Sequence, residues 1–245
     1  MALTERQNEI LRKLKEDKSA AVSVLAKDLY VSEATIRRDL AEMKSMGLIE
    51  RSHGGALLPE NSEEISIFFR MEKNASEKER AATKALPHLP SFKSVFIDSS
   101  STALALAERI DLSYKTVVTN NLQTAIQLSK KPNINLILLG GNVHFNTNSA
   151  TGSWTARQLA DFSLDLMISS CAAIIGSEVF ERSLEQKEIK RAAFKRCQKR
   201  ILLIDHTKFS ASGTYRLSAL SEYDLVVTDT APPYELEVGN TKLVY

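Results

Sequence analysis

Apolar positions near the start of the chain recur with the spacing of a helix. Ile10, Leu11 and Leu14 fall on one helical face, so they are expected to face a core. Thr4 precedes them and Gln7 follows it by three positions, which is the pattern of a capping box. The pattern therefore predicts a first helix that begins directly after Thr4.

Two further helices follow in the same style. Ser23 is a suitable cap for a short helix over 23–29, and Ser32 is the natural cap of a third helix that runs to about Met46. Gly47 then provides the usual C-terminal stop. Three apolar residues, spaced four and three apart in the third helix, share one face that should pack on the first two helices: Ile36, Leu40 and Met43.

Two short strands, over 48–51 and 56–58, surround a turn that contains His53, Gly54 and Gly55. The glycines permit a tight hairpin turn. Three helices followed by a hairpin predict a winged helix-turn-helix DNA-binding domain over residues 1–57.

Residues 58–74 lose this periodicity and are expected to form a linker, with an apolar patch that can dock on a domain. From residue 75 to 245 strand-like runs alternate with helical ones, which predicts an α/β domain with a mostly parallel sheet. The expected strands are 94–97, 116–119, 134–139, 165–169, 200–204 and 224–227. The expected helices include 102–110, 122–130 and 184–197.

The third helix carries the candidate reading surface for DNA. Arg38 points away from the apolar face, and Thr35 and Arg37 lie to either side of it. Arginines near the start of a capped helix suit phosphate or guanine in the major groove, whereas the alternative is an ordinary solvated face. Arg51 and His53 in the wing can reach the backbone or the minor groove, or form an ordinary polar hairpin. The candidate DNA-binding residues are Ser23, Ser32, Glu33, Thr35, Arg37, Arg38, Arg51, His53 and Gly54.

Hydroxyl-rich and glycine-rich loops follow several expected strands of the α/β domain. Ligands of open α/β sheets gather at the carboxyl ends of the strands, where hydroxyls and backbone N–H groups can hold a phosphate. Lys208 is placed to neutralise such a phosphate. A plain capped helix start is the alternative for the serine loop. The candidate effector-binding residues are Asp98, Ser99, Ser100, Ser101, Thr102, Thr119, Asn120, Gly140, Gly141, Asp205 and Lys208.

Composition changes this picture little. Residues 1–57 hold 10 Lys and Arg against 9 Asp and Glu, so bulk charge does not by itself indicate DNA binding. The longest apolar runs are far short of the ~20 residues that span a bilayer, and the charged first residues do not resemble a secretory signal. We therefore expect a cytoplasmic protein with free thiols at Cys171 and Cys197. The four scattered histidines and the absence of nucleotide glycine motifs predict no metal and no cofactor.

Several runs together resemble the DeoR family of bacterial regulators. They are VSEATIRRDL at 31–40, GLI at 47–49, HGGA at 53–56, FR at 69–70, EK at 77–78, VTN at 118–120, LGG at 139–141 and DHTKF at 205–209. The resemblance covers essentially the whole chain. It implies a regulator of sugar metabolism, usually a repressor, whose C-terminal domain resembles ribose 5-phosphate isomerase and senses a phosphorylated sugar or related metabolite.

The leading hypothesis is therefore a homo-oligomeric regulator, not an enzyme, that binds a double-stranded DNA operator under the control of a phosphorylated sugar. One alternative is a sugar-phosphate isomerase or transferase fused to a DNA-binding module, with Asp98 or Asp205 as general base. A second alternative is that the C-terminal domain only oligomerises, because family members typically have glycine at Ser100 and within 169–173. The operator, the target genes and the effector are not specified by the sequence.

Overall fold

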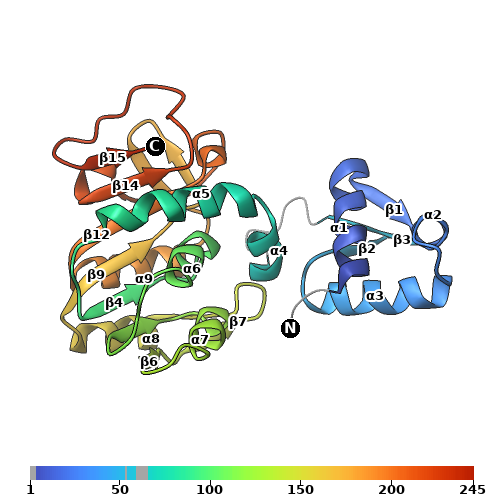
Figure 1. Ribbon diagram of the computed structural model, residues 1–245, viewed down its shortest axis with the longest axis horizontal. Coiled ribbons are helices and arrows are strands. Elements are labelled where there is room, and N and C mark those ends of the chain that lie inside the picture. The colour runs from blue at the N-terminus through green and yellow to red at the C-terminus, as the bar shows by residue number, and fades with distance from the viewer. Residues whose placement is uncertain (1–3, 53, 59–65) are drawn as a thin grey trace. The chain divides into compact units, whose positions relative to one another are not determined.

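The computed structural model describes residues 4–52, 54–58 and 66–245. The chain divides into two compact units, Met1–Phe69 and Arg70–Tyr245. Each unit has its own helices and strands (Figure 1). The first unit contains one hydrophobic core, and the second contains two. His53, one of the candidate DNA-binding residues, lies outside the described residues.

The first unit consists of three helices and a small antiparallel sheet. Its elements are α1 (Glu5–Asp17), β1 (Ser19–Ala21), α2 (Val22–Asp28), α3 (Glu33–Ser45), β2 (Glu50–Ser52) and β3 (Gly55–Leu57). The strands run in the order β1-β3-β2, with both pairs antiparallel. β1 was not expected, because Ser-Ala-Ala carries no alternating pattern and is held only by its pairing with β3.

The expected caps of this unit are present with one exception. Thr4 and Gln7 form the capping box of α1, and the Ser32 hydroxyl accepts from the backbone N–H of Thr35 at the start of α3. The expectation for Ser23 is wrong: α2 begins one residue earlier, its cap position is Ala21, and no side chain caps it. The N–H of Val22 instead bonds a wing carbonyl, so a backbone contact supplies what a cap would have supplied.

Part of the predicted linker forms a helix, α4 (Ile67–Glu72). Phe69 of this helix is buried in the core of the first unit, together with Ile10, Leu40 and Met43. The sequence pattern missed the helix because six residues are too few to show a periodicity.

Within residues 70–245 a seven-stranded sheet forms the centre of the second unit (Figure 1). Its order is β15-β14-β12-β9-β4-β5-β6, and every neighbouring pair is parallel. The strands are β4 (Ser94–Ile97), β5 (Thr116–Thr119), β6 (Asn135–Leu138), β9 (Leu164–Ser169), β12 (Cys197–Ile204), β14 (Leu225–Thr228) and β15 (Lys242–Val244). The prediction of a mostly parallel sheet is confirmed.

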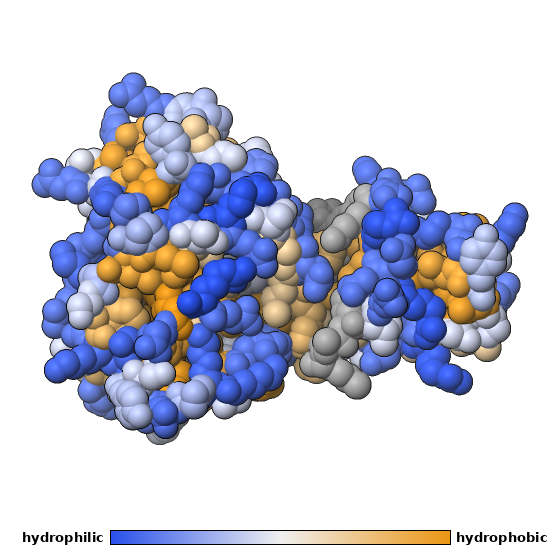
Figure 2. Space-filling model, viewed as in Figure 1, coloured by the Kyte–Doolittle hydropathy of each residue, from blue (hydrophilic) through white to orange (hydrophobic). Residues whose placement is uncertain are grey.

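Helices cover both faces of this sheet. One core lies beneath α5 (Ala75–Ala85), α6 (Ser101–Ala107) and α7 (Leu122–Leu128). The other lies beneath α8 (Ser153–Gln158) and α9 (Leu184–Phe194). Hydrophilic side chains cover much of the visible surface, and apolar ones reach it in places (Figure 2). Two smaller antiparallel groups complete the unit: β7 (Asn142–His144) with β8 (Ser149–Thr151), and β10 (Ala173–Ile175), β11 (Glu178–Glu181) and β13 (Tyr215–Ala219).

The strand order reverses direction between β4 and β9. From β4 the chain adds β5 and β6 on one side, and it then returns to add β9, β12, β14 and β15 on the other. Such a switch point leaves a crevice at the carboxyl ends of the two strands, where α/β proteins bind ligands. Asp98 directly follows β4 and Ser169 ends β9, so the fold brings these two residues to the switch point.

Candidate functional site

The third helix, α3, is amphipathic in the manner that the sequence predicts. Ile36, Leu40 and Met43 are completely buried in the core of the first unit. The Ser32 hydroxyl accepts from the Thr35 N–H at 3.2 Å, which fixes the start of the helix. Because the apolar face is buried and the first turn is capped, the opposite face of α3 points to solvent.

The exposed face of α3 carries the two candidate arginines. The Arg37 side chain is 61% exposed and forms an ion pair with Glu33 at 2.7 Å, one helical turn earlier. Arg38 is exposed as well, and within the described residues it has no ion pair. Thr35 lies beside them and shares a hydrogen bond with the hydroxyl of Ser32. This face presents cationic and hydroxyl groups to solvent, as a groove-binding helix requires.

Two polar contacts, neither of them predicted from the sequence, hold α3 against α1. Arg6 forms a two-pronged ion pair with the buried Asp39, at 2.5 and 3.1 Å. Gln7 donates to Glu42 at 2.9 Å. Bidentate arginine–carboxylate pairs fix orientation as well as distance. The contacts therefore set the angle at which α3 projects its arginines.

The hairpin packs closely because of a glycine. A Cβ on Gly55 would lie 2.3 Å from the Ala20 carbonyl oxygen, so only glycine lets β3 approach β1. Arg51 is exposed on β2, and Gly54 is exposed with a φ of +82° in the turn. Ser23 is exposed on α2. The described candidate residues of the first unit are thus all at its surface except Thr35, which is half-buried.

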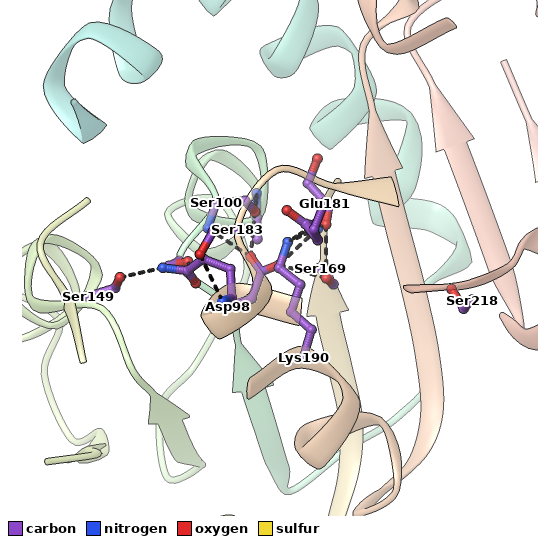
Figure 3. Close-up of polar contacts among 12 residues, drawn as sticks. Asp98, Ser100, Ser149, Ser169, Glu181, Ser183, Lys190 and Ser218 are labelled. Atoms are coloured by element: carbon purple, nitrogen blue, oxygen red, sulfur yellow. Dashed lines mark hydrogen bonds and ion pairs between the residues drawn. The ribbon is translucent and has the colours of Figure 1, made fainter. Parts of the chain in front are cut away.

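A second polar site lies at the switch point of the large sheet. Asp98 is 1% exposed, and both of its carboxylate oxygens accept hydrogen bonds. Ser100 donates to one oxygen through its N–H and its hydroxyl, and the Ser169 hydroxyl and the Ser170 N–H donate to the other. Figure 3 shows this convergence. Asp98 is therefore a buried anchor for two loops.

Lys190 completes this network from α9. Its ammonium group lies 3.0 Å from Asp98 and 2.6 Å from Glu181, and it donates to the Ser170 carbonyl at 2.7 Å. Burial acts to raise the pKa of Asp98, but the charge of Lys190 and the hydrogen bonds from the serines outweigh it, so that pKa is lowered. Burial raises the pKa of Glu181. The pKa of Lys190 is raised because its two carboxylate partners outweigh its burial.

A cluster of basic side chains, which includes Lys78 and Lys208, lies beside this network. Lys78 is 6% exposed and donates to the backbone carbonyls of Arg70 and Lys73. Burial and the nearby charge of Lys208 lower the pKa of Lys78 to about 7. The carboxylate of Asp205 lies near the ammonium group of Lys78 and accepts a hydrogen bond from the Asn74 side chain at 3.4 Å. The carboxyl end of β12 therefore combines several cations with one buried carboxylate.

The loops after the strands are joined to one another. Gln186 accepts from the Ser99 hydroxyl at 2.8 Å and donates to the Ser149 hydroxyl at 2.7 Å. Asn120 donates to the carbonyl of Ala150 at 2.9 Å. The serine loop, the loop after β5 and the β7–β8 hairpin are thus brought together. Thr102 and Thr119 are buried within the same region.

The hydroxyls of the serine loop already have partners within the protein. Ser99 donates to Gln186, Ser100 donates to Asp98, and Ser101 donates to the carbonyl of Arg70. Ser100 has a φ of −87°, which any residue adopts, so a serine fits where the family typically has glycine. Other buried oxygens in the described chain lack a hydrogen-bond partner, and five of them come from residues at or just after strand ends: Asn120, Thr151, Ser170, Asp205 and Thr228.

Gly140 and Gly141 occupy a structural position at the end of β6. The Gly140 carbonyl accepts from the Thr155 hydroxyl and from Gln158, both on α8. A Cβ on Gly141 would lie 1.9 Å from the Thr155 hydroxyl oxygen. These glycines attach α8 to the edge of the sheet.

Sequence reasoning missed three buried residues of the second site, Lys78, Glu181 and Gln186, and it gave a fourth, Lys190, only a weak claim beside Lys187. The helix over 185–191 reads as a solvated run of charges, because a single sequence does not show which charged side chain faces inward. Lys78 appears in the sequence only within the run that resembles the family. The signal that could have found Lys190 is its position four residues after Gln186 on one face of α9.

The part of the chain that the structure describes has neither a metal-binding cluster nor a membrane-spanning helix. No group of three histidine, cysteine or acidic side chains there is arranged to hold a metal ion. In the same residues, no helix combines the length and apolarity needed to cross a bilayer.

Comparison with known proteins gives family matches over both units. Residues 6–62 match the DeoR-like helix-turn-helix domain, and residues 73–230 match the DeoR C-terminal sensor domain. The HTH-type transcriptional regulator GolR of Listeria innocua is 36% identical, over 92% of this chain and 90% of that protein. The glycerol-3-phosphate regulon repressor of Escherichia coli is 32% identical, over 95% and 93%.

Among solved structures the similarity is weaker. A ribose-5-phosphate isomerase in complex with phospho-erythronic acid is 14% identical and aligns with a TM-score of 0.40, over 55% of this chain and 54% of that one. The family assignment therefore depends on the sequence matches to both domains. Together with the capped helix that presents Arg37 and Arg38, those matches show that this chain belongs to the DeoR family of DNA-binding transcriptional regulators.

Proposed function

We propose that this protein is a repressor that binds a DNA operator through the exposed face of α3 and releases it when a phosphorylated sugar or polyol binds the second unit. The observation that carries the DNA-binding part is the exposed pair Arg37 and Arg38, opposite a fully buried stripe on a capped helix. Arg51 and the turn at Gly54 lie in the wing of the same unit and are proposed to contact the backbone.

The effector is proposed to bind at the carboxyl ends of β4, β9 and β12. Lys208 is half-buried there, next to the buried Lys78, so the region favours an anion. The oxygens without partners on Ser170 and Asp205 are suited to the hydroxyls of a sugar or polyol. One ligand with a phosphate and several hydroxyls would satisfy both features.

Binding without turnover is the expected chemistry. Both oxygens of Asp98 are occupied by hydrogen bonds, so this residue is a poor general base. One carboxylate oxygen of Asp205 has no hydrogen-bond partner, so Asp205 is the remaining candidate for a general base. A turnover assay with pentose and hexose phosphates tests this role. Product formation at a rate that depends on Asp205 would favour the enzyme instead.

The DNA-binding proposal is tested with an operator selected from random-sequence DNA by the purified protein. Arg38→Ala is expected to weaken specific binding by about 1–3 kcal/mol, because it removes a base or phosphate contact. Arg12→Ala is the matched control, since Arg12 is a 56% exposed arginine paired with Glu9 and Glu16 on α1. Equal operator affinity of the Arg38 variant and wild type would remove Arg38 from the reading surface.

The effector proposal is tested by thermal shift with phosphorylated and unphosphorylated sugars and polyols. A ligand at 100 times its Kd stabilises the folded state by about 2.7 kcal/mol, which shifts the melting temperature measurably. Lys208→Gln should abolish the shift and leave operator binding intact. Lys199→Gln is the control, because Lys199 lies on β12, the strand that precedes Lys208, is 57% exposed, and pairs with Asp224 before the carboxyl end of that strand. A shift that survives Lys208→Gln would contradict the assigned phosphate position.

The direction of regulation is tested by transcription from a template that carries the selected operator. Repression predicts fewer transcripts when the protein is added and recovery when the stabilising ligand is added. An increase in transcripts on adding the protein would mean activation.

A further inference from the structure

The turn between α2 and α3 is built around a tyrosine in the left-handed conformation. Tyr30 has a φ of +53°. The N–H of Val31 bonds the Ala26 carbonyl at 3.0 Å, and the N–H of Tyr30 bonds the Lys27 carbonyl at 3.4 Å. These two bonds form the Schellman motif, in which the left-handed position is usually glycine because a side chain there is strained. The chain therefore keeps an unfavourable residue at this turn.

The side chain of Tyr30 adds nothing to the core of the first unit. Tyr30 is 95% exposed, whereas its neighbours Leu29 and Val31 are half-buried and pack against that core. The turn is thus held by the two neighbours and by the backbone. A large side chain that is strained, exposed and not needed for packing indicates a role in binding.

A left-handed tyrosine is not by itself a sign of function in this chain. Tyr114 in the second unit has a φ of +60° and is 85% exposed, in the segment before β5. What distinguishes Tyr30 is its place, two residues before Ser32, which caps α3. Two residues span at most about 7 Å, so Tyr30 lies close to the first turn of the helix that presents Arg37 and Arg38.

The surroundings of Tyr30 suit the backbone of a DNA duplex. The first turn of a recognition helix enters the major groove, and phosphates border that groove on both sides. Tyrosine is among the side chains that bond phosphate oxygens, and such contacts fix a protein on the duplex without reading its sequence. The carboxylates of Asp28 and Glu33, on either side of the turn, are paired with Lys13 and Arg37. A phosphate near Tyr30 would therefore not face an unpaired carboxylate from these two residues.

We propose that Tyr30 contacts the phosphate backbone of the operator at the edge of the groove that α3 enters, with its hydroxyl donating to a phosphate oxygen. The proposal rests on DNA binding through α3, and it adds to that surface a residue outside the helix. The contact helps to fix the position of α3 on the duplex and contributes equally to all sequences. The strain at Tyr30 is then a loss of stability that the chain carries in exchange for affinity.

The first test measures the affinity of Tyr30→Phe and Tyr30→Gly for the selected operator and for a random duplex by fluorescence anisotropy. Tyr30→Phe removes only the hydroxyl, so binding should weaken by about 2–10-fold. The factor should be the same on both duplexes, because a phosphate contact carries no sequence information. Tyr30→Gly should weaken binding at least as much without lowering the melting temperature, because glycine adopts a positive φ freely.

Tyr114→Gly is the matched control and should leave both affinities unchanged, because it relieves the same kind of strain in the other unit. Arg38→Ala is measured alongside. If Arg38→Ala weakens operator binding and both Tyr30 variants bind as wild type does, only the present proposal is overturned. If Arg38→Ala also has no effect, the exposed face of α3 is not the reading surface. A loss confined to the operator would mean a base contact and would overturn the assignment to phosphate.

The second test locates the contacted phosphate. A series of operators carries a neutral methylphosphonate in place of one phosphate at a time. At the contacted position this change should weaken wild type more than Tyr30→Phe, by the same factor of about 2–10 that the hydroxyl contributes. Identical profiles for the two proteins would mean that no phosphate accepts the hydroxyl. Tyr30 variants that bind DNA normally but fail to regulate transcription would instead indicate contact with a protein, and the proposal would be wrong.

Discussion

Lys190 balances two buried carboxylates at the centre of the second unit. It is 4% exposed and contacts both Asp98 and Glu181, and each of these is less than one-tenth exposed. A buried charge without its partner is costly, whereas a complete network with good hydrogen bonds is tolerated. The stability of the switch point therefore depends on Lys190 more than its position in a charged helix suggests.

Lys190→Met is expected to lower the free energy of unfolding by about 3–5 kcal/mol at neutral pH, because it leaves two carboxylates without their cation. Lys187→Met is the control on the same helix; that side chain is 28% exposed, and its effect should stay within about 0.5 kcal/mol. Urea denaturation followed by circular dichroism measures both. A Lys190 variant as stable as wild type would show that the network does not stabilise the fold.

The free energy of unfolding of Lys190→Met should also depend on pH in a defined direction. In wild type the pKa of Asp98 is lowered, so its contribution to stability is present above its unfolded pKa and lost as pH falls through the folded value. Without Lys190 the buried carboxylates should bind protons more tightly when folded. The stability of the variant should then fall as pH rises, so its deficit relative to wild type is expected to be larger at pH 8 than at pH 5.

At the scale of elements, α8 is attached to the sheet by hydrogen bonds to the Gly140 carbonyl and by close packing against Gly141. Gly141 has no room for a side chain, since an added Cβ would meet the Thr155 hydroxyl at 1.9 Å and the Thr151 carbonyl at 2.9 Å. Thr155 cannot easily move, because its hydroxyl also donates to the carbonyls of Gly140 and Thr151. Gly140 itself has open space, with the nearest atom at 3.9 Å.

Gly141→Ala should therefore destabilise the protein by about 1–3 kcal/mol, as overpacking generally does. Gly140→Ala is the neighbouring control and should change the melting temperature little. Thermal denaturation of the two variants separates a packing role from a ligand-binding role. If both alanine variants have the melting temperature of wild type, the close approach of α8 to Gly141 does not contribute to stability.

The elements that the sequence predicted well are those with local signals. Caps at Thr4 and Ser32, the stop at Gly47 and the apolar strands of the large sheet all depend on a few neighbouring residues. The elements it missed depend on distant partners. β1 forms because β3 lies beside it, and β15 forms because β14 does.

The candidate site follows the same rule. The loops after β4 and β5 were predictable, because strand ends gather at one edge of a parallel sheet. The cation that pairs with Asp98 after β4 comes from α9, and a second buried lysine comes from α5; nothing in the pattern shows that Lys190 and Lys78 face inward rather than solvent. The alternative hypothesis of an enzyme with Asp98 as general base required a free carboxylate, which the fold instead surrounds with donors.

At the scale of the whole molecule, charge is nearly balanced. The chain has 32 Lys and Arg against 30 Asp and Glu. Affinity for DNA therefore depends on where the cations lie rather than on their number. The exposed arginines of α3 form one such local concentration, and the basic group around Lys208 forms another. The two concentrations belong to different compact units.

The order of the large sheet also has a consequence for synthesis of the protein. β4 lies between β5 and β9, and its three apolar residues are fully buried. Asp98, just after β4, and Ser169, at the end of β9, are 71 positions apart. At ~5–20 residues per second a ribosome needs roughly 4–14 s to add that length. For those seconds β4 can pair with β5 but lacks β9, so one edge of an apolar strand stays uncovered in the nascent chain, which makes this interval the time at which chaperone protection matters most.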